Sequence, residues 1–87
     1  MLVQGTIIGG IFDESMNEFS LTRMKNLYTE SVLSEKQMNN IYQYLLLHRD
    51  SEDGQIVTLY DQMPLRLSKE EINQLIGDIE EVMSKYH

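Results

Sequence analysis

The chain has 87 residues, of which 14 are Asp or Glu and 7 are Lys or Arg, so its formal net charge at neutral pH is −7. This charge repels nucleic-acid phosphates and anionic lipid, which disfavours direct binding to either. The absence of Cys excludes disulfides and thiolate sites, and the length suits one domain over residues 1–87.

Residues 2–12 are largely apolar and predict a strand. Gly9 and Gly10 within it indicate a bulge or a close backbone approach. No basic residue precedes this run, and polar residues interrupt it. It therefore resembles neither a signal peptide nor a membrane span, and we expect a cytoplasmic protein.

Residues 13–31 allow two interpretations. In the first, residues 13–17 form a hairpin turn and a second strand follows over 18–21. In the second, Ser20 is the N-cap of a helix. We combine the two and predict a hairpin that returns to about residue 21, followed by a short helix over about 22–31.

A helix is predicted over about 34–49. Ser34 and Gln37 have the spacing of a capping box, in which each side chain bonds the other residue's backbone N–H. Tyr44 and Leu47 add apolar surface outside the stripe of this helix that faces the core. Two alternatives stay open: both side chains are buried beneath the sheet, or both contact a partner or a second copy.

A polar turn over residues 50–54 leads to a β-branched and aromatic run, residues 55–60, which predicts a short strand. The last helix is predicted over about 69–86, because Ser68 and Glu71 form a second capping box. An apolar stripe follows at helical spacing, and carboxylates, including Asp78, are expected on the opposite, solvated face.

These elements predict a small α+β domain. A short antiparallel sheet over about 2–12, 18–21 and 55–60 packs against two or three helices, over about 22–31, 34–49 and 69–86. A core of this size is marginal without disulfides or metal, so self-association would stabilise it, and we expect a homodimer.

No residue is predicted to act in catalysis or to hold a metal or a cofactor. Neither His48 nor His87 has a second His at the spacing of a helical zinc pair, and Gly5, Gly9 and Gly10 lack the Lys of a phosphate-binding loop. The carboxylates stand in runs typical of solvated surfaces, whereas a catalytic pair needs one acid in a dry pocket. We therefore expect a protein that is not an enzyme.

Partner binding is the function that this pattern favours. The candidate residues are the two additional apolar side chains of the helix over 34–49 and the carboxylates of two acidic clusters: Tyr44, Leu47, Asp50, Glu52, Asp53, Asp13, Glu14 and Glu18. In the alternative interpretation, these clusters only keep the protein soluble. The leading hypothesis is a regulator or inhibitor that binds another protein with a basic surface. Small phage-encoded inhibitors, anti-CRISPR proteins among them, have a similar size and charge. By analogy with them, the carboxylates of this chain would imitate the phosphates of a nucleic acid. The alternative is an assembly protein, either an obligate homodimer or a small subunit of a larger particle.

Overall fold

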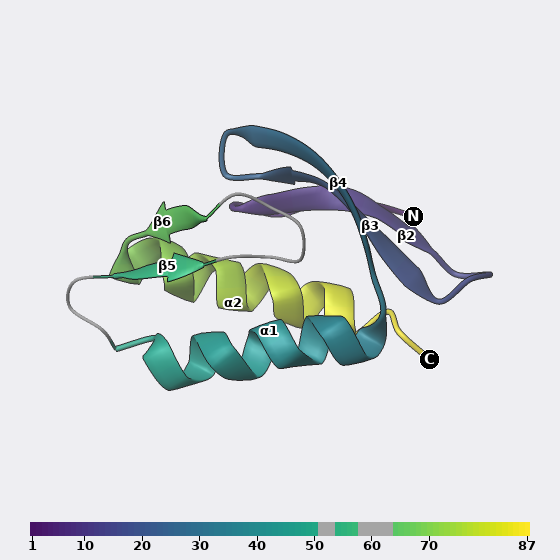
Figure 1. Cartoon of the computed structure of the whole chain (residues 1–87). Helices are drawn as coiled ribbons and strands as arrows, with labels where there is room; N and C mark the ends of the chain where they lie inside the picture. The colour runs from purple at the N-terminus through teal and green to yellow at the C-terminus, as the bar shows by residue number, and fades with distance from the viewer. Residues whose placement is uncertain (51–53, 58–63) are drawn as a thin grey trace.

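The computed structural model describes residues 1–50, 54–57 and 64–87, and it confirms the α+β fold (Figure 1). Strands β1 to β4 form an antiparallel sheet in chain order, and β5 and β6 form a separate two-stranded sheet. The bounds are β1 Leu2–Gln4, β2 Ile8–Asp13, β3 Glu18–Met24, β4 Leu27–Leu33, β5 Gln55–Val57 and β6 Leu65–Leu67.

Helices α1 (Glu35–His48) and α2 (Lys69–Met83) both lie on one side of the four-stranded sheet (Figure 1). Each begins with the predicted capping box, at Ser34 for α1 and at Ser68 for α2. Among the described residues, no helix lies on the opposite face of this sheet.

Helix α2 ends three residues earlier than the predicted limit at residue 86. The N–H of Ser84 donates to the carbonyl of Glu80, and the chain then leaves the helix. Tyr86 is nevertheless buried, with its ring edge against Phe12 at a centroid distance of 4.9 Å.

The single strand predicted over 2–12 is wrong, because residues 5–7 separate β1 from β2. The carboxylate of Asp78 in α2 accepts the backbone N–H groups of residues 6–8 at 2.6 to 3.1 Å. Asp78 is only 8% exposed, so its placement on a solvated face was also wrong. The backbone N–H groups of this turn find their hydrogen-bond acceptor in a carboxylate about 70 residues away in the chain. Local sequence patterns do not reveal so distant a contact.

The helix predicted over 22–31 is also wrong. This segment is the end of β3, a two-residue turn at Lys25 and Asn26, and most of β4. Lys25 adopts a left-handed conformation with φ of 58°, and its N–H donates to the carbonyl of Ile7 at 2.6 Å. Pairing with the neighbouring strand therefore outweighs the helical spacing of the apolar residues.

The strand predicted over 55–60 does not join the main sheet. Its first residues form β5, which pairs with β6. Residues 58–60 lie outside the described ranges.

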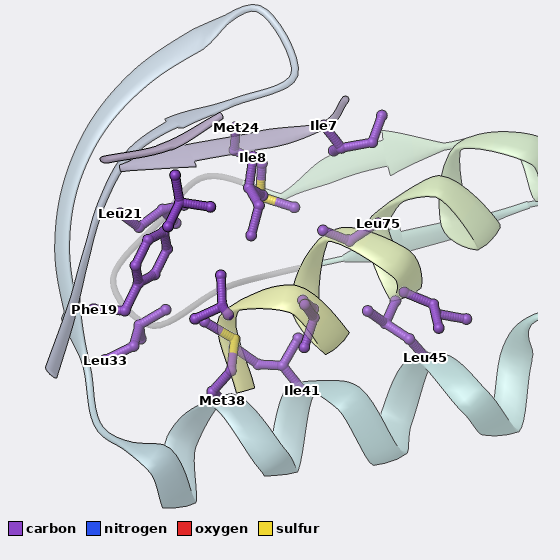
Figure 2. Packing of buried hydrophobic residues seen from close by; sticks show 14 of the residues in the cluster. Ile7, Ile8, Phe19, Leu21, Met24, Leu33, Met38, Ile41, Leu45 and Leu75 are labelled. Atoms are coloured by element: carbon purple, nitrogen blue, oxygen red, sulfur yellow. The ribbon is translucent and has the colours of Figure 1, made fainter. Parts of the chain in front are cut away.

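The core fills the space between the four-stranded sheet and the two helices. Figure 2 shows Phe19, Leu21 and Leu33 of the sheet pointing toward Met38 and Ile41 of α1. The apolar stripe predicted for α2 supplies the other side of this core. Burial of these side chains is the principal stabilising contribution to the domain.

Candidate protein-binding surfaces

Four residues form a line across the face of the sheet that is turned away from the helices. Cross-strand pairs join Leu2 to Ile11, Ile11 to Ser20 and Ser20 to Val32, and directly paired residues share a face. The exposed fraction is 65% for Leu2, 51% for Ile11 and 56% for Val32. A solvated sheet face ordinarily carries polar residues, so this line, which we call the outer row, is an uncovered apolar surface.

Gly10 fixes the register that produces the outer row. The pairing of β2 with β3 shifts between Gly9 and Gly10, which confirms the predicted bulge. A Cβ atom on Gly10 would collide with the carbonyl oxygen of Ser20, so the two strands can approach only at a glycine. Beyond the bulge, Phe12 enters the core and Ile11 points outward.

Carboxylates stand beside the outer row at the turn between β2 and β3. This turn confirms the predicted hairpin, and it pairs Asp13 with Glu18. Asp13 is two residues beyond Ile11 in β2, so its side chain leaves the same face. Within the described residues, no ion pair involves Asp13, Glu14 or Glu18.

Asp13 is held in its ionised form by the turn. Its Oδ1 atom accepts the Ser15 hydroxyl at 2.6 Å, the Ser15 N–H at 3.0 Å and the Met16 N–H at 3.2 Å. These hydrogen bonds, the Ser15 hydroxyl first, lower the pKa of Asp13 below its ordinary value of 3.8. The terminal ammonium of Met1, which donates to the carbonyl of Phe12 at 2.9 Å, lowers this pKa further, and no described residue donates a hydrogen bond to Oδ2.

The helix α1 carries a second uncovered apolar pair, Tyr44 and Leu47, which we call the α1 flank. Leu47 is 81% exposed and Tyr44 is 39% exposed, so the alternative in which both lie beneath the sheet is wrong. The Tyr44 ring packs against the ring of His48 with centroids 4.5 Å apart. Asp50 follows the helix and is exposed. Contact of this flank with a partner stays a prediction.

The predicted site residues do not form one surface. The β2–β3 turn, which holds Asp13, Glu14 and Glu18, lies at one end of the molecule, and the C-terminal end of α1 lies at the other (Figure 1). Glu52 and Asp53 lie outside the described residues. The apolar surface beside the first acidic cluster is the outer row, which sequence reasoning missed because its members belong to four strands.

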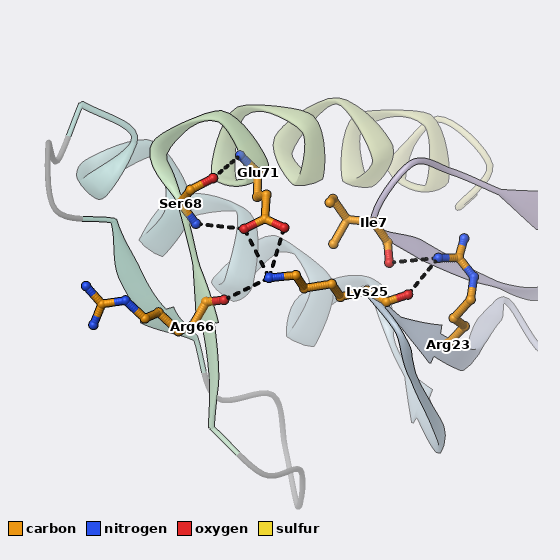
Figure 3. A network of polar contacts seen from close by, with 6 residues as sticks. All are labelled: Ile7, Arg23, Lys25, Arg66, Ser68 and Glu71. Carbon is orange, nitrogen blue, oxygen red and sulfur yellow. Dashed lines mark hydrogen bonds and ion pairs between the residues drawn. The ribbon is translucent and has the colours of Figure 1, made fainter.

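A polar network ties the β3–β4 turn to the start of α2 (Figure 3). The Nζ atom of Lys25 lies 3.0 Å from Oε2 of Glu71, whose Oε1 accepts the Ser68 N–H at 2.9 Å. The hydrogen bond with Ser68, together with the Lys25 ammonium, lowers the pKa of Glu71 below its ordinary value of 4.5. This network links the β3–β4 turn to the first turn of α2.

The described residues contain no group of three or more His, Asp or Glu that could hold a metal ion. A cavity of about 10 Å³ within the core, bounded by Ile8, Met38 and other apolar side chains, has room for one water molecule at most. Neither α1 nor α2 has the length and apolar character that a membrane-spanning helix requires.

Comparison with known proteins gives no indication of function, so a functional proposal rests on the geometry of the surface. No protein-family model matches the chain, and neither a curated protein nor a solved structure resembles it.

Proposed function

We propose that this chain is a small protein–protein interaction module that regulates or inhibits a partner by covering part of its surface. The outer row is the observation that carries the proposal. It presents Leu2, Ile11 and Val32 to solvent on a sheet face that no described element covers. Uncovered apolar patches with a polar border are typical of protein-binding sites.

The proposal extends to an inhibitor that acts in the cytoplasm and competes with nucleic acid, as small phage-encoded inhibitors do. Asp13, Glu14 and Glu18 supply three carboxylates without described ion-pair partners beside the outer row. Carboxylates so placed can take the positions of phosphates on a basic surface, and electrostatic steering would accelerate the encounter.

Affinity capture from a bacterial lysate tests the proposal. Wild type is compared with the double variant Ile11→Ser/Val32→Ser, which removes two of the three apolar side chains of the outer row. The control is Leu47→Ser, at a still more exposed site on α1. We expect a discrete partner to be retained by wild type and by the control but lost by the double variant. Retention of the same proteins by all three would refute the proposed surface.

An assembly protein is the second candidate, and the α1 flank favours it. The side chain of Leu47 is 81% exposed to water on the surface of α1. Contact between subunits would cover this side chain. Sedimentation of wild type against Leu47→Glu tests this candidate. A homodimer would be converted to monomers by the substitution, whereas two identical monomeric species would exclude self-assembly through this flank.

A further inference from the structure

We infer that the side chain of Asn17 clasps the segment that follows α2, and that this contact holds the β2–β3 turn and its carboxylates in one position beside the outer row. Asn17 is then a positioning residue of the proposed binding surface. The inference rests on the proposed function and adds to it the part of the chain that orders the acidic turn. We call the pair of hydrogen bonds between Asn17 and His87 the clasp.

The clasp consists of two reciprocal hydrogen bonds. Nδ2 of Asn17 donates to the main-chain oxygen of His87 at 2.7 Å, and Oδ1 of Asn17 accepts the His87 N–H at 3.0 Å. One side-chain amide thus bonds both polar groups of a single residue's backbone, as paired residues of neighbouring strands do. The two residues are 70 positions apart in the sequence, and they meet at the end of the molecule that carries the β2–β3 turn (Figure 1).

The segment that the clasp holds is itself anchored in the core. Tyr86, directly before His87, is only 8% exposed, and its ring edge meets the ring of Phe12 in β2. The Tyr86 hydroxyl donates to the carbonyl of Leu33, the last residue of β4. Because His87 follows an anchored residue, Asn17 joins the turn to a fixed part of the molecule.

Like charges give the turn a reason to need this restraint. Asp13 and Glu18 are directly paired across β2 and β3, and Glu14 follows Asp13 in the turn. Carboxylates at opposed positions of a sheet repel each other, which favours separation of the strand ends. The terminal ammonium of Met1 favours the ionised form of Asp13 and offsets part of this repulsion. The clasp acts on the same turn from the side of β3.

The backbone of the turn is held at both ends. At the β2 end, Oδ1 of Asp13 accepts the N–H groups of Ser15 and Met16. At the β3 end, Asn17 adopts a left-handed conformation with φ of 54°, which asparagine tolerates better than most residues. Asn17 therefore supplies both the left-handed position of the turn and the amide of the clasp. A turn that is ordered before binding spares a partner the entropic cost of ordering it.

Exchange of backbone amides with water, measured by NMR on the ¹⁵N-labelled full chain, tests the clasp. Asn17→Gly removes the amide but accommodates the left-handed conformation. The control is Asn73→Ala, which removes an exposed amide whose Nδ2 donates to the carbonyl of Lys69 within α2.

We expect Asn17→Gly to accelerate exchange at Ser15, Met16 and His87 by at least about threefold and to leave the amides of β3 unchanged. The response at His87 separates loss of the clasp from the added flexibility of glycine, which acts on the turn alone. The control variant should match wild type at all three positions. Wild-type exchange at His87 or at the turn in Asn17→Gly, or a rise that β3 shares, would overturn the inference.

Binding separates the clasp from the proposed function. The partner captured by wild type is titrated onto Asn17→Gly and onto Asn73→Ala. We expect the affinity of the first variant to fall about threefold and that of the second to equal wild type. Wild-type affinity of Asn17→Gly, although Ile11→Ser/Val32→Ser loses the partner, would overturn the inference and leave the proposed function intact. Capture of no partner by wild type would refute the proposed function, and the exchange rates would still decide whether the clasp orders the turn.

Discussion

The carboxylate of Asp78 lies directly against the Cα of Gly5, where a Cβ atom would collide with it. From this position the carboxylate accepts the N–H groups of residues 6–8 and fastens α2 to the turn between β1 and β2. The contact joins the first strands of the sheet to the last helix. It therefore positions the strand β2, on which both Ile11 and Asp13 stand.

Substitution of Asp78 should lower stability strongly. Asp78→Ala leaves three backbone N–H groups without an acceptor, and we expect a loss of about 3 kcal/mol in the free energy of unfolding. Asp78→Asn keeps one carbonyl oxygen and should lose about half as much. Urea denaturation measures both, with Glu81→Ala at an exposed site of the same helix as the control. A loss for Asp78→Ala no larger than that of the control would refute the anchoring role.

Gly5→Ala should be destabilising on its own but not in the absence of the Asp78 carboxylate. The added methyl group collides with Asp78 in the wild type, whereas Asp78→Ala removes the colliding atoms. The double variant Gly5→Ala/Asp78→Ala should therefore lose at least about 1 kcal/mol less than the sum of the two single losses. Additive losses in urea denaturation would show that the steric contact is unimportant.

Tyr86 should make the domain sensitive to alkali. Its hydroxyl donates to the carbonyl of Leu33 at 2.7 Å, and burial raises the pKa of Tyr86 from 10.0 to about 12. The folded chain holds this proton more tightly than the unfolded chain, so the stabilisation is complete below the ordinary value of 10.0 and falls as the pH rises toward about 12. Tyr86→Phe should lose about 1 kcal/mol at neutral pH and show a flatter alkaline limb in thermal melts. An unchanged alkaline limb would contradict this assignment.

Glu71 should contribute stability that acid removes. Its pKa is lowered by the hydrogen bond with Ser68 and by Lys25, so its contribution is present above the ordinary value of 4.5 and is lost as the pH falls through the lower folded pKa. Glu71→Gln preserves the capping box, as Gln37 does in α1, but removes the ion pair. The variant should lose less than about 1 kcal/mol at pH 7 and match wild type in strong acid. A gap between the two melting curves that persists in acid would contradict the ion-pair explanation.

Leu47→Glu should leave the isolated domain as stable as wild type. The side chain stands in solvent, so the free energy of unfolding should change by no more than about 0.5 kcal/mol. Thermal melts at two protein concentrations measure it. A large loss that depends on protein concentration would instead show that this leucine is covered by another copy.

The helices were predictable because their signals are local. The N-termini of the two helices are marked by Ser34 with Gln37 and by Ser68 with Glu71, and each pair spans only four residues of sequence. The helical spacing of the apolar residues then predicts the remainder of each helix. The hairpin turn over residues 13–17 was likewise found from its own composition.

The strands and the sheet face depend on distant partners and were therefore only partly predictable. The β1–β2 turn is held by Asp78, and the β3–β4 turn places Lys25 in a conformation that few residues other than glycine favour. The outer row becomes visible only once Leu2, Ile11 and Val32 are paired across four strands. The clustering of charge in the sequence located the acidic residues beside this row, whereas the apolar residues predicted for the site, Tyr44 and Leu47, lie on α1.

Photo-cross-linking tests the contact surface most directly. Benzoylphenylalanine is placed at position 11 or, as the comparison, at position 47, and each protein is irradiated with the partner captured by wild type. A covalent adduct from position 11 and none from position 47 is the predicted result. An adduct from position 47 alone would move the contact to the α1 flank and contradict the role given to the outer row.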